Sequence, residues 1–337
     1  MTTEEMKWQA IVAKYAKPDL RRSLWQVANT LIPYVVLWYL MIRSLEISYW
    51  ITLGLSVFAA GFLMRAFIIF HDCGHGSFFK SQKANDLVGI VTGLLNFTPY
   101  YRWKHEHAIH HATASDLDRR GVGDVYTMTV KEYLAAPWWR QAGYRIMRNP
   151  FALLGVGPLL LFVINQRIPL PSQSKRSRDS IWWTNLALAA IIALMCALVG
   201  WKTFLLVQLP IITISSTIGI WMFYVQHNFD PSYWDHHEGW EFVKAGLQGS
   251  SFYKLHPILQ WFSGNIGFHH IHHLSSKIPN YNLPKCYYEN PLFHVRPLTF
   301  AGSLKSLSLR LYDEEQKIMI GWSGLKRYRA QPVKVRI

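Results

Sequence analysis

Four stretches of the chain are long and apolar enough to cross a bilayer as helices. They cover about residues 25–42, 49–70, 181–200 and 203–225. A hydrocarbon core about 30 Å thick requires roughly 20 apolar helical residues. Short polar segments join the first two stretches and the last two. The pattern therefore predicts two helical hairpins, each of which enters and leaves the membrane on one side.

Two further apolar stretches, residues 87–101 and 151–164, are shorter than a full span. Basic residues flank the second stretch on both sides, which opposes a membrane crossing. We expect both stretches to be interfacial or re-entrant helices at the cytoplasmic surface. A six-span arrangement is the alternative. Residues 169–180 are rich in polar and turn-forming residues, which is typical of a linker.

The basic residues divide the chain into two sides. Residues 1–24, 71–180 and 226–337 hold 32 of the 35 Lys and Arg residues, and the two hairpin loops hold only Arg43 and Lys202. Cytoplasmic segments carry this excess, so both termini and the middle segment are expected in the cytoplasm. Arg65, near the end of the second span, is expected to reach the headgroups. The whole chain, 1–337, is predicted to be one membrane-embedded domain.

Composition narrows the class of protein further. Half of the 337 residues are hydrophobic and only 16% are charged, well below the roughly 25% of a soluble domain. The net charge of +15 is spread over loops beside apolar spans, which argues against a nucleic-acid partner. Three cysteines make no disulfide framework, and no cleavable signal peptide is predicted.

Ten of the 15 histidines fall into three tight clusters. The clusters are His-Asp-Cys-Gly-His at 71–75, His-Glu-His-Ala-Ile-His-His at 105–111 and His-His-Ile-His-His at 269–273. Histidines three or four positions apart share one face of a helix. Eight imidazoles can therefore converge from three helical segments, all on one side of the membrane.

So many imidazoles predict a metal centre with more than one ion, because a structural zinc ion takes only about four ligands. Imidazole suits iron, copper and zinc alike, so the residues alone do not choose the metal. Three nearby carboxylates, Asp72, Glu106 and Asp124, are either partners that orient the imidazoles or surface charges. Cys73, inside the first cluster, is a further possible ligand.

The three clusters resemble the histidine boxes HxxxH, HxxHH and HxxHH of the membrane fatty acid desaturases. The order and spacing of boxes and hairpins also agree, and the resemblance covers about residues 30–300. Matching context surrounds the boxes at residues 102–104, 226–227 and 265–268. Residues 247–255 and 259–265 are most similar to bacterial acyl-lipid desaturases of the phospholipid-acting Δ5 type. The resemblance thus implies an all-α membrane fold with a helical cytoplasmic cap.

The resemblance also implies which residues hold the metal. Carried over box by box, the ligands are His71, His75, His107, His110, His111, His269, His272 and His273, with His227 after the fourth span as an additional ligand. Asn265 is a candidate for a water-mediated contact. His105 is the alternative ligand if the second box is read in another register, and His270 falls outside the box spacing. The remaining clustered or isolated histidines, at positions 236, 237, 256 and 294, are expected to be ordinary surface residues.

By the same resemblance, the chain is an oxidoreductase that uses two iron ions and O₂ to form a cis double bond in a saturated acyl chain. The acyl slot is expected between the spans, with Phe70, Trp221 and Tyr224 either lining it or simply packing helices. Flavin and dinucleotide fingerprints are absent from the sequence. An external ferredoxin or flavodoxin donor is therefore implied.

Three alternatives stay open at this point. A membrane hydroxylase or ketolase shares the histidine boxes but leaves oxygen in its product. A Δ9 or Δ12 desaturase differs only in the position of the double bond. A metal transporter should carry ionisable residues within its spans, and these spans contain almost none. The expected location is the plasma membrane of a bacterium.

Overall fold

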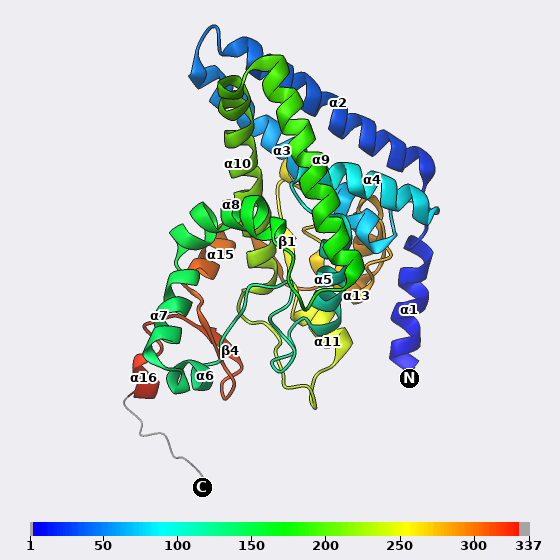
Figure 1. Cartoon of the computed structure of the whole chain (residues 1–337). Coiled ribbons are helices and arrows are strands. Elements are labelled where there is room, and N and C mark those ends of the chain that lie inside the picture. The colour runs from blue at the N-terminus through cyan, green and yellow to red at the C-terminus, as the bar shows by residue number, and fades with distance from the viewer. Residues whose placement is uncertain (1–2, 330–337) are drawn as a thin grey trace.

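A computed structural model describes residues 3–329, and four long helices dominate it (Figure 1). They are α2 (Leu20–Ser44), α3 (Tyr49–His75), α9 (Lys175–Val199) and α10 (Trp201–His227). Within the described residues these four helices are long and apolar enough to cross a membrane. Helices α2 and α3 form one antiparallel pair, and α9 and α10 form the other. The predicted pair of hairpins on a helical fold is confirmed.

Local sequence signals set the ends of these helices. The side chain of Asp19 accepts a hydrogen bond from the backbone N–H of Arg22 at the start of α2, and Ser48 caps α3 in the same way. Such side chains satisfy backbone donors that a first helical turn leaves free. Gly76 ends α3 in the left-handed conformation, with φ of 65°, which glycine adopts without steric cost.

The spans extend farther toward the cap than the hydrophobic pattern predicts. Helix α3 continues through His75, and α10 continues to His227. The first histidine box therefore belongs to the same rigid rod that crosses the membrane. The prediction for Arg65 is wrong: its residue is only 6% exposed, and its guanidinium lies 3.9 Å from the centre of the Trp261 ring. Burial under that ring keeps it from the headgroups.

The two shorter apolar stretches differ from expectation in detail. Residues 87–101 form no single helix, because α4 (Gln82–Leu95) ends before Pro99 and α5 (Tyr100–Thr113) begins after it. Proline lacks the N–H that a continuous helix would need. The stretch 151–164 is helical, with α8 (Gly157–Leu159) between the π-helical turns η1 (Ala152–Val156) and η2 (Leu160–Ile164).

Helix α7 (Trp138–Met147) meets the helical segment Ala152–Arg167 at a bend of 61°, so this pair is at most one broken span. The structure therefore supports four spans, or five if the bent pair crosses, rather than six. The linker prediction for 169–180 is wrong after residue 174, because Ser174 caps α9 and Lys175 is already helical.

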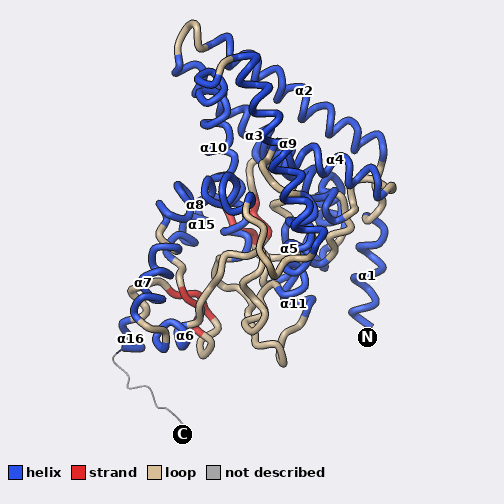
Figure 2. Tube along the Cα trace, in the orientation of Figure 1, coloured by secondary structure: helices blue, strands red, loops and turns tan. Residues whose placement is uncertain are grey.

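The rest of the chain builds a cap below the spans from short elements (Figure 2). Its helices are α1 (Thr3–Tyr15), α6 (Val130–Ala135), α11 (Phe242–Gln248), α12 (Pro257–Phe262), α13 (His269–Leu274), α14 (Leu283–Glu289), α15 (Phe300–Ser303) and α16 (Lys326–Arg329). Short 3₁₀ turns lie at Asn165–Arg167, Asn280–Asn282, Pro291–Phe293 and Leu304–Ser308. Strand β1 (Phe252–Lys254) pairs in parallel with β2 (Pro297–Thr299), and β3 (Leu311–Asp313) pairs antiparallel with β4 (Ile318–Ile320).

One cap element rises beside the spans, which the sequence did not predict. The ring of Phe262 on α12 packs so closely on α3 that a Cβ added at Gly61 would lie 2.9 Å from it. Phe62 packs edge-on against Trp261 with ring centres 5.9 Å apart. Gly61 precedes His71 by ten residues, or about 15 Å of helix. Helix α12 therefore reaches well into the depth that α3 spans.

Close packing of α4 onto α3 yields a first prediction. A Cβ at Gly93 would lie 2.7 Å from the backbone oxygen of Thr98 and 3.0 Å from the Phe70 ring, whereas a Cβ at Gly54 would meet nothing within 4 Å. Gly93→Ala should cost about 1–3 kcal/mol of stability, while Gly54→Ala should cost none. Thermal unfolding of both variants in detergent measures this. Equal melting temperatures would contradict the packing described here.

Candidate metal centre

Nine histidines gather into two groups at the cap end of the spans. His71, His75, His107, His111 and His272 form the first site, and His110, His227, His269 and His273 form the second site. Within each group, one ligand nitrogen per residue lies within 4.8 Å of all the others. These are the nine residues that the sequence predicts as ligands, and the structure brings all of them together.

Four helices deliver these side chains. Helix α3 supplies His71 and His75 one turn apart, with ring centres separated by 4.7 Å. Helix α10 supplies only its last residue, His227, to the second site. Helices α5 and α13 each divide their histidines between the two sites. The sites are therefore adjacent, and His111 of the first stacks on His273 of the second at 4.2 Å.

The imidazole nitrogens point at one another rather than at ordinary hydrogen-bonding partners. Nε2 of His227 lies 3.1 Å from Nε2 of His110 and 2.9 Å from Nε2 of His269. Nε2 of His111 lies 3.1 Å from Nε2 of His107 and 3.0 Å from Nε2 of His272. Converging lone pairs repel unless a proton or a cation lies between them. The donor set therefore fits a metal centre.

Burial sets the charge of these groups. In the cap, burial first and neighbouring imidazoles second hold the pKa of His107, His111 and His272 well below the usual value of 6.5. The same burial lowers the pKa of the second-site residues His110 on α5 and His269 and His273 on α13. At neutral pH these imidazoles are uncharged, which is the form that coordinates a metal ion.

A buried carboxylate orients one of the imidazoles, as predicted for Asp72. Its Oδ1 lies 3.1 Å from Nδ1 of His71. Its Oδ2 accepts hydrogen bonds from the backbone N–H of Asn280 at 2.7 Å and from the side-chain amide at 2.8 Å. Such a partner fixes the tautomer of the ring and turns Nε2 toward the site. Asn280 is the residue that the sequence did not reveal, since 208 positions separate it from Asp72.

The same prediction is wrong for Glu106 and Asp124. Glu106 pairs with the buried guanidinium of Arg102 at 3.0 Å, and Asp124 accepts from the backbone N–H of Gly121 at 3.1 Å. Neither carboxylate bonds to an imidazole among the described residues. Burial raises the pKa of Asp124.

Other candidate ligands lie outside both groups. His105 belongs to neither site, so the alternative register of the second box is not supported. His270 is buried, and its Nε2 lies 2.9 Å from the backbone oxygen of Phe293. Cys73, a residue of α3, packs among buried aromatic side chains in the core. Asn265 lies in the turn before α13 with φ of 59°, and its water-mediated role stays a prediction.

The four remaining histidines lie at the periphery, as expected. His236 lies between the carboxylates of Asp118 and Glu314, which raise its pKa. His237 lies 3.1 Å from a carboxylate oxygen of Asp116. His256 caps α12, and His294 contacts a backbone oxygen.

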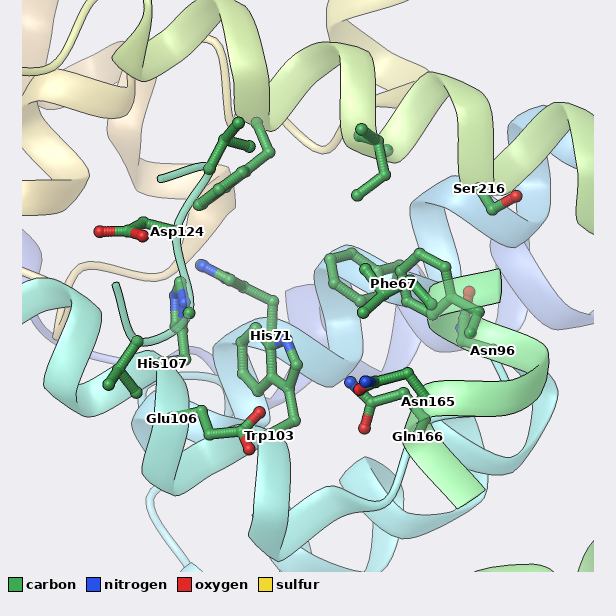
Figure 3. A pocket seen from close by; sticks show the side chains of 18 of the residues that line it. Phe67, His71, Asn96, Trp103, Glu106, His107, Asp124, Asn165, Gln166 and Ser216 are labelled. Carbon is green, nitrogen blue, oxygen red and sulfur yellow. The ribbon is translucent and has the colours of Figure 1, made fainter. Parts of the chain in front are cut away.

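A cavity of about 610 Å³ leads to the two sites (Figure 3). His71 and His107 of the first site and His269 of the second site are among its lining residues. One face of α10 lines it from Ile212 to Gln226, a length of about 21 Å. Opposite this face, α3 contributes Met64, Phe67 and Ile68. The cavity is thus a long apolar passage beside the histidines.

The cavity also has a polar region, formed by Asn96, Asn165, Gln166 and Gln173, of which the first three are labelled in Figure 3. The expected liners Phe70, Trp221 and Tyr224 are not among the lining residues, so that prediction is wrong. The ring of Phe70, on α3, packs edge-on against the ring of Tyr100, on α5. The hydroxyl of Tyr224 donates to the backbone oxygen of Ser306. These side chains hold the helices together.

Comparison with known proteins identifies the family. A fatty acid desaturase family model matches residues 48–297, which include all three boxes and the helices α3, α9 and α10. The chain belongs to the fatty acid desaturase family. It is 48% identical over 316 residues to a fatty acid desaturase of Bacillus subtilis (strain 168), covering 94% of this chain and 90% of that protein. It is therefore a multi-pass membrane protein, and its family are oxidoreductases that act on fatty acids.

More distant relatives of this desaturase are also similar along most of the chain. An sn-1 acyl-lipid omega-3 desaturase (ferredoxin) of Nostoc sp. (strain 36) is 26% identical, covering 82% of this chain and 77% of that protein. An sn-1 oleoyl-lipid 12-desaturase of Anabaena variabilis is 25% identical, covering 85% and 86%.

The contact between Asp72 and His71 yields a second prediction. Asp72→Asn removes the anionic acceptor and should lower the metal affinity of the centre about 10- to 100-fold. Competition of the purified protein with a chelator, followed by elemental analysis, measures this. Asp179→Asn removes a carboxylate at a distant, exposed ion pair and should retain the parent affinity. If Asp72→Asn held metal as tightly as this control, the carboxylate would have no orienting role.

Proposed function

We propose that this protein is an oxygen-dependent di-iron desaturase that introduces a cis double bond, at the Δ5 position, into saturated acyl chains of membrane phospholipids. The observation that carries the proposal is the pair of histidine groups beside a long apolar cavity that three of their members line. The proposed ligands are His71, His75, His107, His111 and His272 for one iron ion and His110, His227, His269 and His273 for the other. When bound, the two iron ions would supply the means to use O₂ as the oxidant.

The choice of iron rests on the donor set and on the family together. Uncharged imidazoles suit iron, copper and zinc, and the two sites contain imidazole alone. Zinc has no redox chemistry, whereas removal of two hydrogens from an acyl chain is an oxidation. His111 of the first site, whose ring stacks on that of His273 in the second site, would keep the two ions next to each other.

The chain's own contribution to the reaction is to grip and position the acyl chain. Each methylene buried in the cavity contributes about 0.8 kcal/mol, so no polar contact is needed along the apolar arm. The face of α10 that ends at Gln226 and the facing residues of α3 define the path. Correct placement of one carbon–carbon unit beside the sites would supply much of the rate.

A phospholipid substrate fits the polar region of the same cavity. Asn165, Gln166 and Gln173 offer amide groups there, which suit the ester and headgroup oxygens of a lipid. Relatives of this chain carry acyl-lipid and oleoyl-lipid desaturase names. The Δ5 position rests on the resemblance of residues 247–255 and 259–265 to phospholipid-acting desaturases.

We also propose the topology and the partners that this chemistry requires. The excess of basic residues in these segments supports a cytoplasmic location for both termini and the histidine sites, and we propose a single domain of residues 1–337 in the plasma membrane. Two electrons per cycle would come from a ferredoxin or flavodoxin, as the name of one relative indicates for itself. Such donors are acidic, and the net charge of +15 would steer them to this protein.

The decisive test is the product, which forms our third prediction. The chain is expressed with a ferredoxin donor in a bacterium without polyunsaturated lipids, and double bonds in its phospholipids are located by gas chromatography–mass spectrometry. A new cis bond at Δ5 is expected. His110→Ala should abolish it, because one of the four nitrogens of the second site is lost, whereas His105→Ala should retain it.

Other products would redirect the assignment. Hydroxylated or oxidised chains would replace the proposal with a hydroxylase or ketolase, and a bond at Δ9 or Δ12 would correct the regiochemistry. Metal uptake by vesicles without any lipid product would indicate a transporter. Unchanged lipids, from protein that is in the membrane and loaded with iron, would contradict the phospholipid substrate or the donor.

A fourth prediction concerns the depth of the cavity. Ser216 lies on the lining face of α10, 11 residues or about 16 Å before His227. Ser216→Phe should block the apolar arm, so that shorter acyl chains are desaturated in preference to longer ones. Competition between saturated chains of different length in the same expression strain measures this. An unchanged chain-length profile would mean that the acyl chain does not reach Ser216.

A further inference from the structure

A second cavity lies beside α9 and shares no lining residue with the first cavity. It has a volume of about 680 Å³ and is bounded by α4, the start of α5 and α9. These helices lie against one another in Figure 1. Ser177, the residue after Arg176 on α9, lines the first cavity instead. The two cavities are separate, so a ligand of the second cavity does not require the proposed reaction.

The cavity changes from charged to apolar along a single stripe of α9. Lys175 and Arg176 stand at its cytoplasmic end, and Trp183 and Ala187 follow two and three turns later. Positions four apart share one face of a helix. From Arg176 to Ala187 the stripe runs about 16 Å, which is about half of a hydrocarbon core. Because the predicted span begins at about residue 181, the groove starts at the headgroup level and ends about 9 Å inside the hydrocarbon core.

The basic end of the groove presents one free guanidinium. The group of Arg176 lies 3.9 Å from the centre of the Tyr101 ring, which fixes it over the cavity. Among residues 3–329, no carboxylate lies within ion-pairing distance of it, whereas Lys175 pairs with Asp179 at 2.8 Å. A planar guanidinium matches phosphate oxygens with two parallel hydrogen bonds.

The opposite wall suits a hydrocarbon chain. Ile90 and Leu94, one turn apart on α4, line the groove, and Ile90 is 40% exposed. Trp183, across from them, is 69% exposed. Large apolar side chains at this exposure need a cover, and on a membrane-spanning helix that cover is lipid. A phosphate group and an acyl chain on one molecule match the two ends of the groove.

We infer that this groove is a binding site for an anionic phospholipid, with the phosphate on Arg176 and an acyl chain between α4 and α9. Because Ser177 on the same turn of α9 lines the histidine cavity, an occupant of the groove touches the helix that borders the proposed reaction site. The site lies outside the metal-binding residues, so its test does not depend on desaturase activity.

The test is a lipid titration of the delipidated full chain in detergent, followed by native mass spectrometry. Phosphatidylglycerol should bind more tightly than phosphatidylcholine with the same acyl chains. Arg176→Gln should weaken the first binding constant for phosphatidylglycerol by about fivefold, the effect of one basic residue at an anionic surface. Ala187→Phe should weaken both lipids by filling the apolar end. Arg140→Gln, an exposed basic position on α7, is the matched control and should bind as the parent does.

A fourth variant separates lipid recognition from damage to the fold. Asp179→Asn frees Lys175 and removes a negative charge from the groove, so it should tighten phosphatidylglycerol binding, whereas a misfolded protein would only lose it. Equal binding of the two lipids, or parent-like binding by Arg176→Gln, would overturn the inference. Displacement of the lipid by inorganic phosphate at equal concentration would overturn it as well, in favour of a free-phosphate site.

Discussion

The structure depends on the packing of uncharged imidazoles against one another in a volume from which water is almost excluded. Nine rings meet with nitrogens about 3 Å apart at the closest pairs, and burial keeps the cap histidines deprotonated. A protonated imidazole here would be both desolvated and repelled by its neighbours. Every element that carries a ring must therefore be held rigidly, since a small displacement would separate the nitrogens.

The fold provides that rigidity by extending two spans beyond the bilayer. Helices α3 and α10 carry His71, His75 and His227 on the same rods that cross the membrane. The short helices α5 and α13 bring in the rest. The aromatic side chains of Phe70 and Tyr224, which the sequence offered as cavity liners, instead pack these elements together. The cavity beside the histidines is lined partly by small residues of α10, among them Ser216 and Gly219.

Patterns within short stretches of the sequence made much of the fold and of the candidate metal centre predictable. Four apolar runs and three boxes at helical spacing were enough for the hairpins and for eight converging histidines, because both follow from residues close together in the chain, whereas His227 was predicted only from the family resemblance. Long-range contacts were not predictable in this way. The partner of Asp72, the burial of Arg65 under Trp261 and the rise of α12 beside α3 each join residues more than 190 positions apart. The roles of Glu106 and Asp124 were mistaken for the same reason, since nearness to a box in sequence does not give nearness to an imidazole.

The bond between Asp72 and Asn280 has a consequence for biogenesis. A ribosome completes the first hairpin, with His71 and His75, long before it reaches Asn280. During that interval the carboxylate of Asp72 has no partner from the last third of the chain, and the histidines of α10 and α13 do not yet exist. Insertion of the first hairpin into the membrane must therefore precede assembly of the two sites, and metal loading belongs to a finished chain rather than to a nascent one.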